Sequence, residues 1–556
     1  MSRKLPKPIG SAVAAAVVLL DVLFMSAVYR DGSRWPTLAA LLIGTVVLVA
    51  RHTYLAHYRP FHTPAAKPDD PDAGVALAGR LQQESGDSPG PSAGEAMAFA
   101  GCLVRPDRFR RRIVEECVPQ GRTLRKTVTV DLEIPERFAA DAAPEHVHLP
   151  ILIGPKGDLL DDFTVRNTNN EETPWLTRGE YLTLVTKVLR VLLSTSEQRA
   201  PGEGLSPDAT KAERRAIECI VRRSDPRHDM QVDHSGAEAI ARLEVDNPVA
   251  QKMAVLFVQA LSGNDAVVVR VRDVDGSRRH RVTYGVTLIP TLVLERSRRS
   301  PRWSGRGFLQ VALGAGSSKL FLDISNAATC QSYHLYVRAP DGCYLAHQAL
   351  RDVHGTTRQQ VDPVRGAPHW RFRERLGQPY AHFHARHFPT ADHGRRPGVE
   401  LAFDEIPPGS TMRATITALA ALAILWMIGF AISKGTDSQA PGTDAPAFLL
   451  VFPALAATWL GLDAPSRVVE VPMSARLSVL ITLVLSVMGT GLYVLHKSLG
   501  HGFDAKVPGG QSILGVSDLT WAVVVAGALL NVLWIGYRCV VQIWAYLTCL
   551  TADPTK

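Results

Sequence analysis

The stretch from Ala414 to Ile432 constrains the architecture of this chain more than any other. It holds 19 residues without a charged side chain, close to the roughly 20 apolar residues that a helix needs to cross a bilayer. A strand-like segment, residues 399–406, precedes it and runs through Pro407-Pro408-Gly409 directly into the apolar run. The sequence therefore predicts a membrane span joined to a water-soluble body by a very short linker, so that body and span move together.

Five other apolar segments predict further spans: Ile9–Tyr29, Thr37–Ala50, Ala445–Leu462, Leu477–Leu495 and Leu519–Tyr537. The first exceeds the roughly 7–15 residues of a signal-peptide core, so we favour a retained span over a cleaved signal. The second is short, and reaches across the bilayer if Arg51 snorkels to the interface. We expect a multi-domain polytopic membrane protein with about six transmembrane helices, a hairpin in residues 1–58 and four helices in residues 411–556.

Residues 59–99 are rich in Pro, Gly and Ala, and we interpret them as a flexible linker. The sequence Gly90-Pro91-Ser92-Ala93-Gly94 matches the G-x-S-x-G pattern of a nucleophile elbow. That motif requires a buried strand before the serine, so that the hydroxyl is exposed on a sharp turn. Only polar and small residues precede it here, so we assign no catalytic role to Ser92.

The body divides by pattern into two predicted domains. Residues 100–295 combine a probable hairpin, 110–134, with a helix after Thr177 and further helices and strands, which indicates an α+β domain. Residues 308–410 contain short strands at regular spacing, which favours an all-β immunoglobulin-like sandwich. No Cys…Trp…Cys spacing accompanies these strands, so the sandwich prediction depends on the strand count.

The distribution of charge around the spans predicts the side on which the body lies. Taking short flanks only, twelve Lys and Arg residues fall on the side of the body and five fall on the other side. The positive-inside rule then places body and termini in the cytoplasm. Seven scattered cysteines without a metal-site spacing are typical of reduced thiols. If the second span failed, the body would be external and Cys330 and Cys343 could pair.

The composition suits a plasma-membrane protein from a GC-rich bacterial genome, because Arg is abundant and Lys is scarce. Residues 51–410 hold 48 Lys and Arg against 44 Asp and Glu. This excess is too small to favour nucleic acid as a partner. Within residues 51–410, residues 296–307 form a basic joint between the two predicted domains. This joint could contact anionic lipid or another phosphate, although a solvated linker is the simpler interpretation. Its arginines are Arg296, Arg298, Arg299, Arg302 and Arg306.

A histidine cluster, His382-Phe383-His384-Ala385-Arg386-His387, is the sharpest candidate for chemistry. On a strand, His382 and His384 share a face, as two imidazole ligands of a metal require. The spacing is similar to the H-x-H-x-D-H of metallo-β-lactamases, but Arg386 replaces the aspartate. We therefore favour a structural or surface strand over a metal site at His382, His384 and His387, and we predict no cofactor and no catalytic residue.

Three polar residues fall within or beside the predicted spans: Asp21, Asn531 and Arg538. A carboxylate in hydrocarbon is costly and suggests a function or a paired partner. Asn531 and Arg538 are candidate partners for Asp21. Proton or ion handling is one interpretation, and a structural polar contact is the other.

We therefore expect an integral membrane protein whose cytosolic body binds a ligand or partner and is coupled to its helices, in a sensor, scaffold or regulatory role. Besides the bilayer, a protein partner or a second copy is the expected contact. One alternative is a channel or transport-related protein gated by the body, which depends on Asp21, Pro453 and Asn531. Another is a membrane-bound metal hydrolase that uses the three histidines.

Overall fold

The structure is a computed structural model of the 556-residue chain. It describes residues 71–87, 90–120, 123–135, 146–156, 160–199, 203–222, 233–272, 278–288, 291–293, 319–354, 357–360, 370–373, 376–389, 395–433, 473–499 and 515–551. All of them belong to one compact unit, Pro71–Lys556. The predicted hairpin in residues 1–58 lies outside the described residues.

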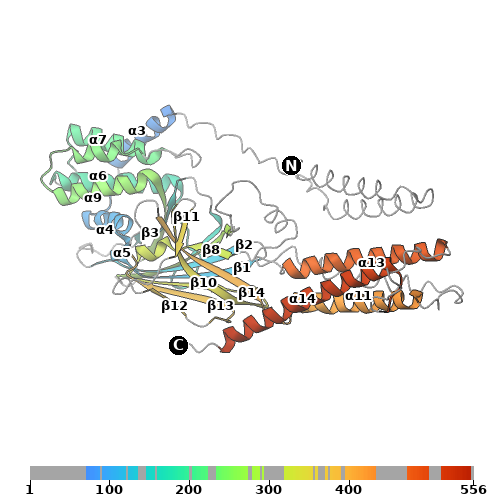
Figure 1. Ribbon diagram of the computed structural model, residues 1–556. Helices are drawn as coiled ribbons and strands as arrows, with labels where there is room; N and C mark the ends of the chain where they lie inside the picture. Colours follow the sequence, from blue (N-terminus) through green and yellow to red (C-terminus); the bar gives the residue numbers. More distant parts are fainter. Residues whose placement is uncertain are drawn as a thin grey trace. The chain divides into compact units, whose positions relative to one another are not determined.

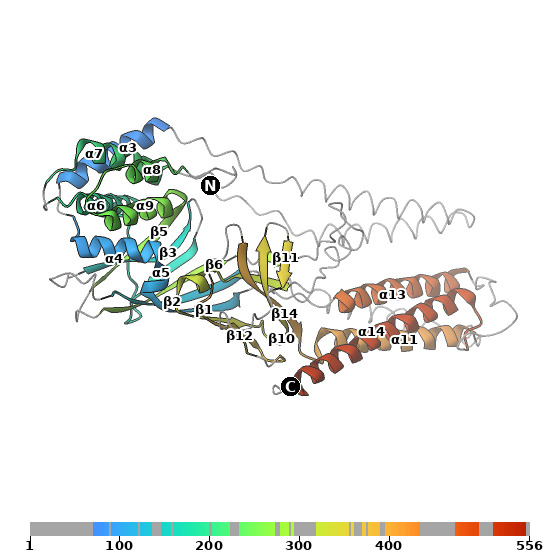
Figure 2. The ribbon, with the colours of Figure 1, turned by 60° about the vertical axis from the view of Figure 1, so that its left-hand side comes forward.

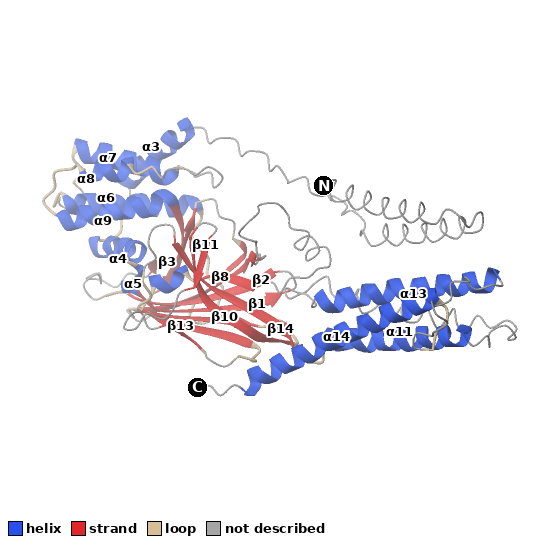
Figure 3. Cartoon of the chain, in the orientation of Figure 1, coloured by secondary structure: helices blue, strands red, loops and turns tan. Residues whose placement is uncertain are grey.

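A layer of helices forms the first part of the body (Figures 1 and 3). Helix α6 begins at a capping box between Thr177 and Glu180 and buries the apolar face that its spacing predicts, including Leu182, Val185 and Leu189. The helices are α3 (Pro71–Asp87), α4 (Ala93–Val104), α5 (Pro106–Phe109), α6 (Arg178–Ser196), α7 (Pro207–Val221), α8 (Ser235–Ala241) and α9 (Pro248–Gly263).

Helices α3 and α4 correct the prediction of a flexible linker over residues 59–99. Both pack in the helical layer, and Ala78 and Phe99 are buried there. Ser92 is the N-cap of α4: its hydroxyl accepts from the Glu95 amide, while the Glu95 carboxylate accepts from the Ser92 amide. The composition misleads because alanine and glycine let helices approach closely and are equally common in linkers.

Among the described residues, three sheets form the rest of the body. One has seven strands in the order β12-β13-β9-β1-β2-β6-β4, one has five in the order β11-β10-β14-β8-β7, and one has two, β3 and β5. The strands are β1 (Arg110–Gln120), β2 (Thr123–Glu133), β3 (His146–Pro155), β4 (Asp161–Arg166), β5 (Asn264–Arg272), β6 (Arg279–Leu288), β7 (Thr291–Val293), β8 (Lys319–Asp323), β9 (Ser332–Arg338), β10 (Cys343–His354), β11 (Thr357–Gln360), β12 (Trp370–Phe372), β13 (Tyr380–Arg386) and β14 (Arg395–Glu405).

The seven-stranded sheet joins strands from both predicted domains. Strands β1 and β2 form the predicted hairpin, but β1 also pairs in parallel with β9, which follows it by more than two hundred residues. The strands of residues 308–410 therefore do not make a separate sandwich, and the immunoglobulin-like fold is not confirmed. Alternating apolar residues show that a strand has a buried face without showing which strand it pairs with.

Two apolar cores hold the body together. The sheet core lies between the seven-stranded and five-stranded sheets and includes Val128, Phe383 and Leu401. The helical core lies among α3, α4, α6, α7, α8 and α9. The two-stranded sheet contributes to both, since Val269 belongs to the first and Val268 to the second. Neighbouring residues of a strand point to opposite faces, so β5 binds the two layers together.

Within the described residues, three helices are long and apolar enough to cross a membrane. They are α11 (Gly409–Ser433), α13 (Met473–Leu499) and α14 (Leu519–Thr551), and they lie side by side (Figures 1 and 2). The other predicted spans, Ile9–Tyr29, Thr37–Ala50 and Ala445–Leu462, lie outside the described residues. Helix α14 continues to Thr551, well beyond the predicted end of its span.

Candidate functional site

The outer face of the seven-stranded sheet carries the predicted histidines. His382 and His384 share a face of β13, as expected, and both are half-buried. The residue opposite His384 is His334 of β9, and the residue opposite His382 is Tyr336. His387 follows the end of the strand at a positive φ of 47° and is exposed. The structure therefore groups His382 and His384 with His334 and Tyr336, and places His387 outside the strand.

The rings of this group stack on one another. His334 and Tyr336 are nearly parallel, at 5°, and the Tyr336 and His382 centroids lie 4.2 Å apart at 13°. His334 Nδ1 lies 3.3 Å from His382 Nε2, within hydrogen-bonding distance. The His384 ring is tilted by 50° against His334, at 4.6 Å. The ring faces are used in these mutual contacts. His334 uses both nitrogens, one on His382 and one on Ser332 Oγ at 3.4 Å, so within the described residues the Tyr336 hydroxyl and the His384 nitrogens remain for other partners.

This imidazole group is not arranged as a metal centre. Across the described part of the chain, no group of three or more His, Cys, Asp or Glu side chains could hold a metal ion. Burial is the main cause that lowers the pKa of His334 to about 4, and His384, His382 and Arg112 lower it further. Burial is also the main cause that lowers the pKa of His382, followed by His384 and Arg373, and the main cause that lowers the pKa of His384, followed by Arg386 and Arg371. The three imidazoles are therefore neutral at pH 7.

Arginines surround the imidazoles. Arg371 of β12 lies directly opposite His384 of β13. Arg386 follows His384 by two residues and lies on the same face of β13. Both arginines are exposed, and among the described residues neither forms an ion pair with a carboxylate. Arg373 packs over the ring of Tyr380 at 5.4 Å. This face therefore presents positive charge next to hydrogen-bonding ring edges.

A hollow of about 490 Å³ lies farther along this sheet and is lined by three arginines and two carboxylates among other residues. Its charges pair with each other. Glu133 binds Arg111 at 2.9 Å and Arg279 at 3.2 Å, and Asp131 binds Arg281 at 2.7 Å. These contacts link strands β1, β2 and β6 across the sheet. Since its carboxylates are already paired with arginines, we interpret the hollow as a network of structural ion pairs.

The inner face of the same sheet holds a buried ion pair. Glu115 of β1 is 1% exposed, and its carboxylate accepts from Lys126 Nζ of β2 at 2.7 Å. Asn326 Nδ2 also donates to this carboxylate, at 2.7 Å. Asn326 belongs to the 3₁₀ helix η2 (Ser325–Thr329), so the pair ties β1 and β2 to a distant loop. Each charge has a partner within the fold.

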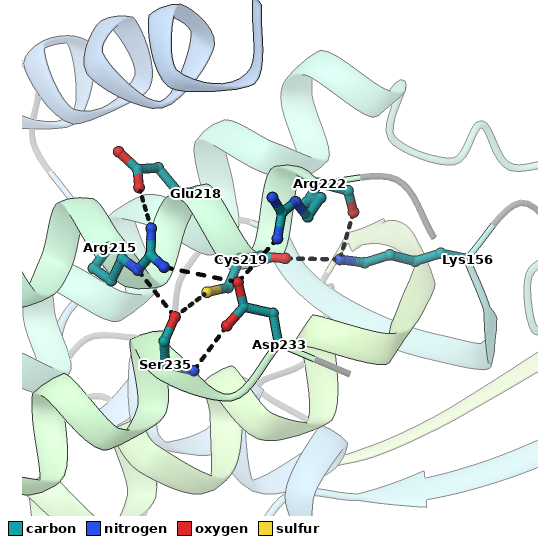
Figure 4. Close-up of polar contacts among 7 residues, drawn as sticks. All are labelled: Lys156, Arg215, Glu218, Cys219, Arg222, Asp233 and Ser235. Carbon is teal, nitrogen blue, oxygen red and sulfur yellow. Dashed lines mark hydrogen bonds and ion pairs between the residues drawn. The ribbon is translucent and has the colours of Figure 1, made fainter. Parts of the chain in front are cut away.

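A further polar cluster surrounds the end of helix α7 (Figure 4). Lys156 Nζ donates to the carbonyl oxygens of Cys219, Ile220 and Arg222 at 3.1, 2.7 and 3.1 Å. A lysine at this position satisfies carbonyls that the helix itself leaves open. Burial lowers the Lys156 pKa to about 8.

The other half of this cluster caps helix α8. Asp233 accepts from the Ser235 amide at 3.0 Å and forms an ion pair with Arg222 at 3.1 Å. Arg215 Nε donates to Ser235 Oγ, which lies 3.5 Å from the buried Cys219 sulfur. Every drawn group has a partner within the cluster (Figure 4). We therefore assign the cluster to helix capping and give Cys219 no reactive role.

Helix α14 contacts the body at its C-terminal end. Gln542 Nε2 donates to the Glu405 carbonyl oxygen at 2.9 Å, and Gln542 Oε1 accepts from Thr411 Oγ1 at 2.7 Å. The Tyr546 ring lies 4.8 Å from that of Tyr344 in β10. At Gly377, just before β13, an added Cβ would lie 3.4 Å from Cys549 Cβ. The strand that carries the histidines thus starts beside the end of a helix long and apolar enough to cross a membrane.

The predicted intramembrane polar residues have different surroundings. Asn531 is buried, and its side chain donates to the Ser478 carbonyl at 3.2 Å and to Thr482 Oγ1 at 3.0 Å, both on α13. Arg538 is exposed on α14. Asp21 and the arginines of the basic joint, 296–307, lie outside the described residues. Asn531 therefore has a structural partner on the neighbouring helix.

Three arginines, Arg413, Arg476 and Arg538, lie at a similar position along the length of the bundle formed by α11, α13 and α14. Arg413 and Arg476 each adjoin an alanine of a small cluster formed by Ala414, Ala418, Ala475 and Ile535, and Arg538 follows Ile535 by one turn. About twenty residues, or roughly 30 Å of helix, separate Arg413 from the end of α11, and a similar length separates Arg538 from the start of α14. This length equals the thickness of a bilayer core.

No family model matches the chain, and no curated protein matches it. Among solved structures, one from Parabacteroides distasonis ATCC 8503, described as a "putative protease", aligns at 9% identity with a TM-score of 0.16. The alignment covers 75% of this chain and 58% of that protein, so the chain spans little more than half of its length. A likeness this weak carries no argument about fold or function.

Sequence reasoning missed the residues that complete the histidine group. His334, Tyr336 and Arg371 come from strands β9 and β12, and only strand pairing brings them beside β13. The alternation of His334 with Tyr336 in a short strand was the available signal. It was also missed that Gln542 and Tyr546, beyond the predicted end of the last span, contact the body.

Proposed function

We propose that this chain is a multi-pass membrane protein whose cytosolic body binds a ligand or protein partner and transmits that binding to its transmembrane helices. The observation that carries the proposal is the second attachment between body and membrane. Strand β14 continues through Ile406, Pro407 and Pro408 into α11. Helix α14 returns to the same place and contacts the body through Gln542 and Tyr546. With two attachments, a shift of the helices must move the body.

The contacts of α14 connect this attachment to the outer sheet face. Tyr344 lies in the five-stranded sheet, and Gly377 leads into β13, which carries His382 and His384. Gly377 has a φ of +83°, a conformation that other residues adopt only with strain. A displacement of Cys549 against this turn would therefore be passed to β13. This route supports a sensor or regulatory role over that of a passive anchor.

Six spans and a cytosolic body are part of the proposal. The level marked by Arg413, Arg476 and Arg538 lies at the body end of the helices, where arginines favour the cytosolic headgroups. The three remaining spans are those predicted at Ile9–Tyr29, Thr37–Ala50 and Ala445–Leu462. The bacterial plasma membrane is the proposed location.

Hydrogen–deuterium exchange tests the coupling. The full chain is placed in nanodiscs of short-chain and of long-chain lipids, and exchange is measured over β13. Because bilayer thickness changes helix tilt, we expect exchange in β13 to differ between the two lipids. The difference should disappear in the Gln542→Ala/Tyr546→Ala variant. It should persist in a matched control, Val540→Ala/Leu547→Ala, whose side chains are exposed on the same helix.

The coupling is refuted if β13 of the unaltered chain exchanges equally in both lipids, or if both double variants behave alike. The orientation is tested separately with Lys211→Cys, because the Lys211 side chain is 81% exposed on the body. A membrane-impermeant maleimide should label it only after the cells are permeabilised. Labelling of intact cells would place the body outside and reject the cytosolic assignment.

A further inference from the structure

From the outer sheet face we infer that the ligand of the body is a small, water-soluble anion bearing phosphate groups, bound by Arg371, Arg386 and the neighbouring imidazoles. The inference depends on the proposed function, since it names the ligand that the coupled body would bind. The site spans strands β9, β12 and β13. Its members come from three segments of the chain that only strand pairing brings together.

Among the described residues, the charges of Arg371 and Arg386 on this face are uncompensated. Arg371 and Arg386 are exposed and lie beside His384, and neither has a carboxylate partner in the described part of the body. Several other arginines of the sheet are paired with carboxylates, as Arg338 is with Glu116 at 2.6 Å. An arginine fork binds phosphate with two parallel hydrogen bonds. Two such forks beside neutral imidazoles match an anion with several oxygens.

The geometry of the rings distinguishes an anion from a stacked base. A platform for a nucleobase needs an aromatic ring that lies flat and open. Here Tyr336 stacks on His382 at 4.2 Å and is parallel to His334 within 5°. The rings cover each other's faces, so a ligand meets their edges. The Tyr336 O–H and the His384 ring edge can donate to phosphate oxygens, whereas His334 and His382 already share a hydrogen-bond contact with each other.

The distance from the bilayer favours a soluble ligand over a lipid headgroup. Strand β13 begins next to Gly377, which contacts Cys549 of α14. Cys549 lies eleven residues beyond Arg538, the residue that marks the membrane level on this helix. Eleven helical residues correspond to about 16 Å along the axis. The start of β13 therefore lies beyond the reach of an ordinary headgroup.

Protonation of the imidazoles supports the inference. The groups that face them are Arg112 and Glu116 on β1, Tyr336 and Arg338 on β9, Arg371 on β12 with Arg373 just after it, and Tyr380 and Arg386 on β13. Burial, followed by the neighbouring imidazoles and then Arg112 and Arg386, holds the pKa of His334 at about 4. A bound anion would offset the cationic groups and raise this pKa. Binding should therefore take up protons and strengthen as the pH falls from 7.5 to 5.5.

Calorimetric titration of the full chain in nanodiscs with sodium pyrophosphate tests the site. We expect saturable binding that weakens about tenfold or more in Arg371→Ala/Arg386→Ala, because each lost charged hydrogen bond costs at least that factor. The matched control is Arg214→Ala/Arg242→Ala, which removes the same charge from exposed helical positions. Its affinity should stay within about twofold of the unaltered chain. His384→Gln, which keeps the sheet intact, should weaken binding less and reduce the gain at pH 5.5.

Three outcomes would overturn the site: no binding of pyrophosphate, equal loss in both double variants, or unchanged affinity in Arg371→Ala/Arg386→Ala. Nanodiscs with and without phosphatidylglycerol separate the two sources of phosphate. Competition by the anionic lipid would assign the face to a membrane surface and reject the soluble ligand. The coupling experiment uses bilayer thickness and no ligand, so it can succeed while this titration fails.

Discussion

The inner face of the seven-stranded sheet and the part of its outer face at β12 and β13 treat charge in opposite ways. On the inner face, Glu115 and Lys126 lie within one apolar core, and Asn326 satisfies the remaining carboxylate oxygen. On the outer face, Arg371 and Arg386 lie beside neutral imidazoles without a carboxylate among the described residues. A buried charge with an opposite charge beside it serves the structure, because burying a charge without such a partner is costly. A charge that the fold leaves open in a cluster is available to a ligand.

The largest expected effect comes from breaking the inner pair. Lys126→Met leaves the Glu115 carboxylate buried without its cation, and we expect the free energy of unfolding to fall by about 3–5 kcal/mol. Chemical unfolding of the full chain in micelles measures the loss. The outer-face counterpart, Arg371→Met, should change stability by less than about 0.5 kcal/mol. Equal losses at the two positions would break the contrast between the faces.

The double variant Glu115→Gln/Lys126→Met sharpens this test. Removing both charges leaves no uncompensated ion, so it should recover part of the stability that Lys126→Met loses. A double variant that is less stable than the single one would show that packing, rather than charge, dominates at this pair.

An intermediate effect is expected at Lys156, whose ammonium group donates to three carbonyl oxygens of the fold. Lys156→Met removes the donor to three carbonyl oxygens at the end of α7, and we expect a loss of about 2–3 kcal/mol. Lys211→Met, at an exposed position of the same helix, is the matched control. Unfolding midpoints in denaturant compare the two. If Lys156→Met were as mild as its control, the cluster would not serve as a helix cap.

The pH dependence of Lys156 gives a second readout. Burial lowers its pKa from the ordinary 10.5 to about 8 in the folded chain. Between these values the unfolded chain binds the extra proton, so folding stability should rise with pH across this window. Lys156→Met should lack that rise when unfolding is followed from pH 8 to 10. A rise of the same size in both proteins would assign the effect to another group.

The smallest effect on stability is expected on the outer face. The histidines of the outer face have lowered pKa values in the folded chain, about 4 for His334. In the unfolded chain the pKa of a histidine is about 6.5. Acidification from pH 6.5 towards 4 should therefore lower the unfolding temperature of the unaltered chain. His334→Gln should change stability little at pH 7 and should reduce this acid-induced loss. The comparison is made by thermal unfolding at both pH values, and an unchanged acid sensitivity would contradict the assignment.

Local patterns predicted several elements well. The alternation in residues 123–134 gave the β1–β2 hairpin, the apolar spacing after Thr177 gave α6, and the period of two put His382 and His384 on one face. The apolar runs gave three helices able to cross a membrane. Each depends on neighbours within a few residues, so the signal is present in the sequence itself.

Other features depended on contacts between distant segments. The linker prediction failed at α3 and α4 because their alanine-rich faces become helical by packing in a shared core. Asn531 was weighed as a partner for Asp21, but it binds Ser478 and Thr482 on the next helix. Amino-acid composition shows neither whether a segment packs in a core nor which side chain becomes its neighbour.

By itself, the sequence determined that a polar body is joined to apolar spans by a short linker, because hydrophobicity and chain length are properties of the residues in order. Only the tertiary structure decided that β1 pairs with β9, that His334 and Arg371 lie beside His384, and that α14 returns to contact the body. These are choices among many partners of similar local pattern. The packing of the whole core selects among them, since a shifted strand would turn its apolar residues towards water.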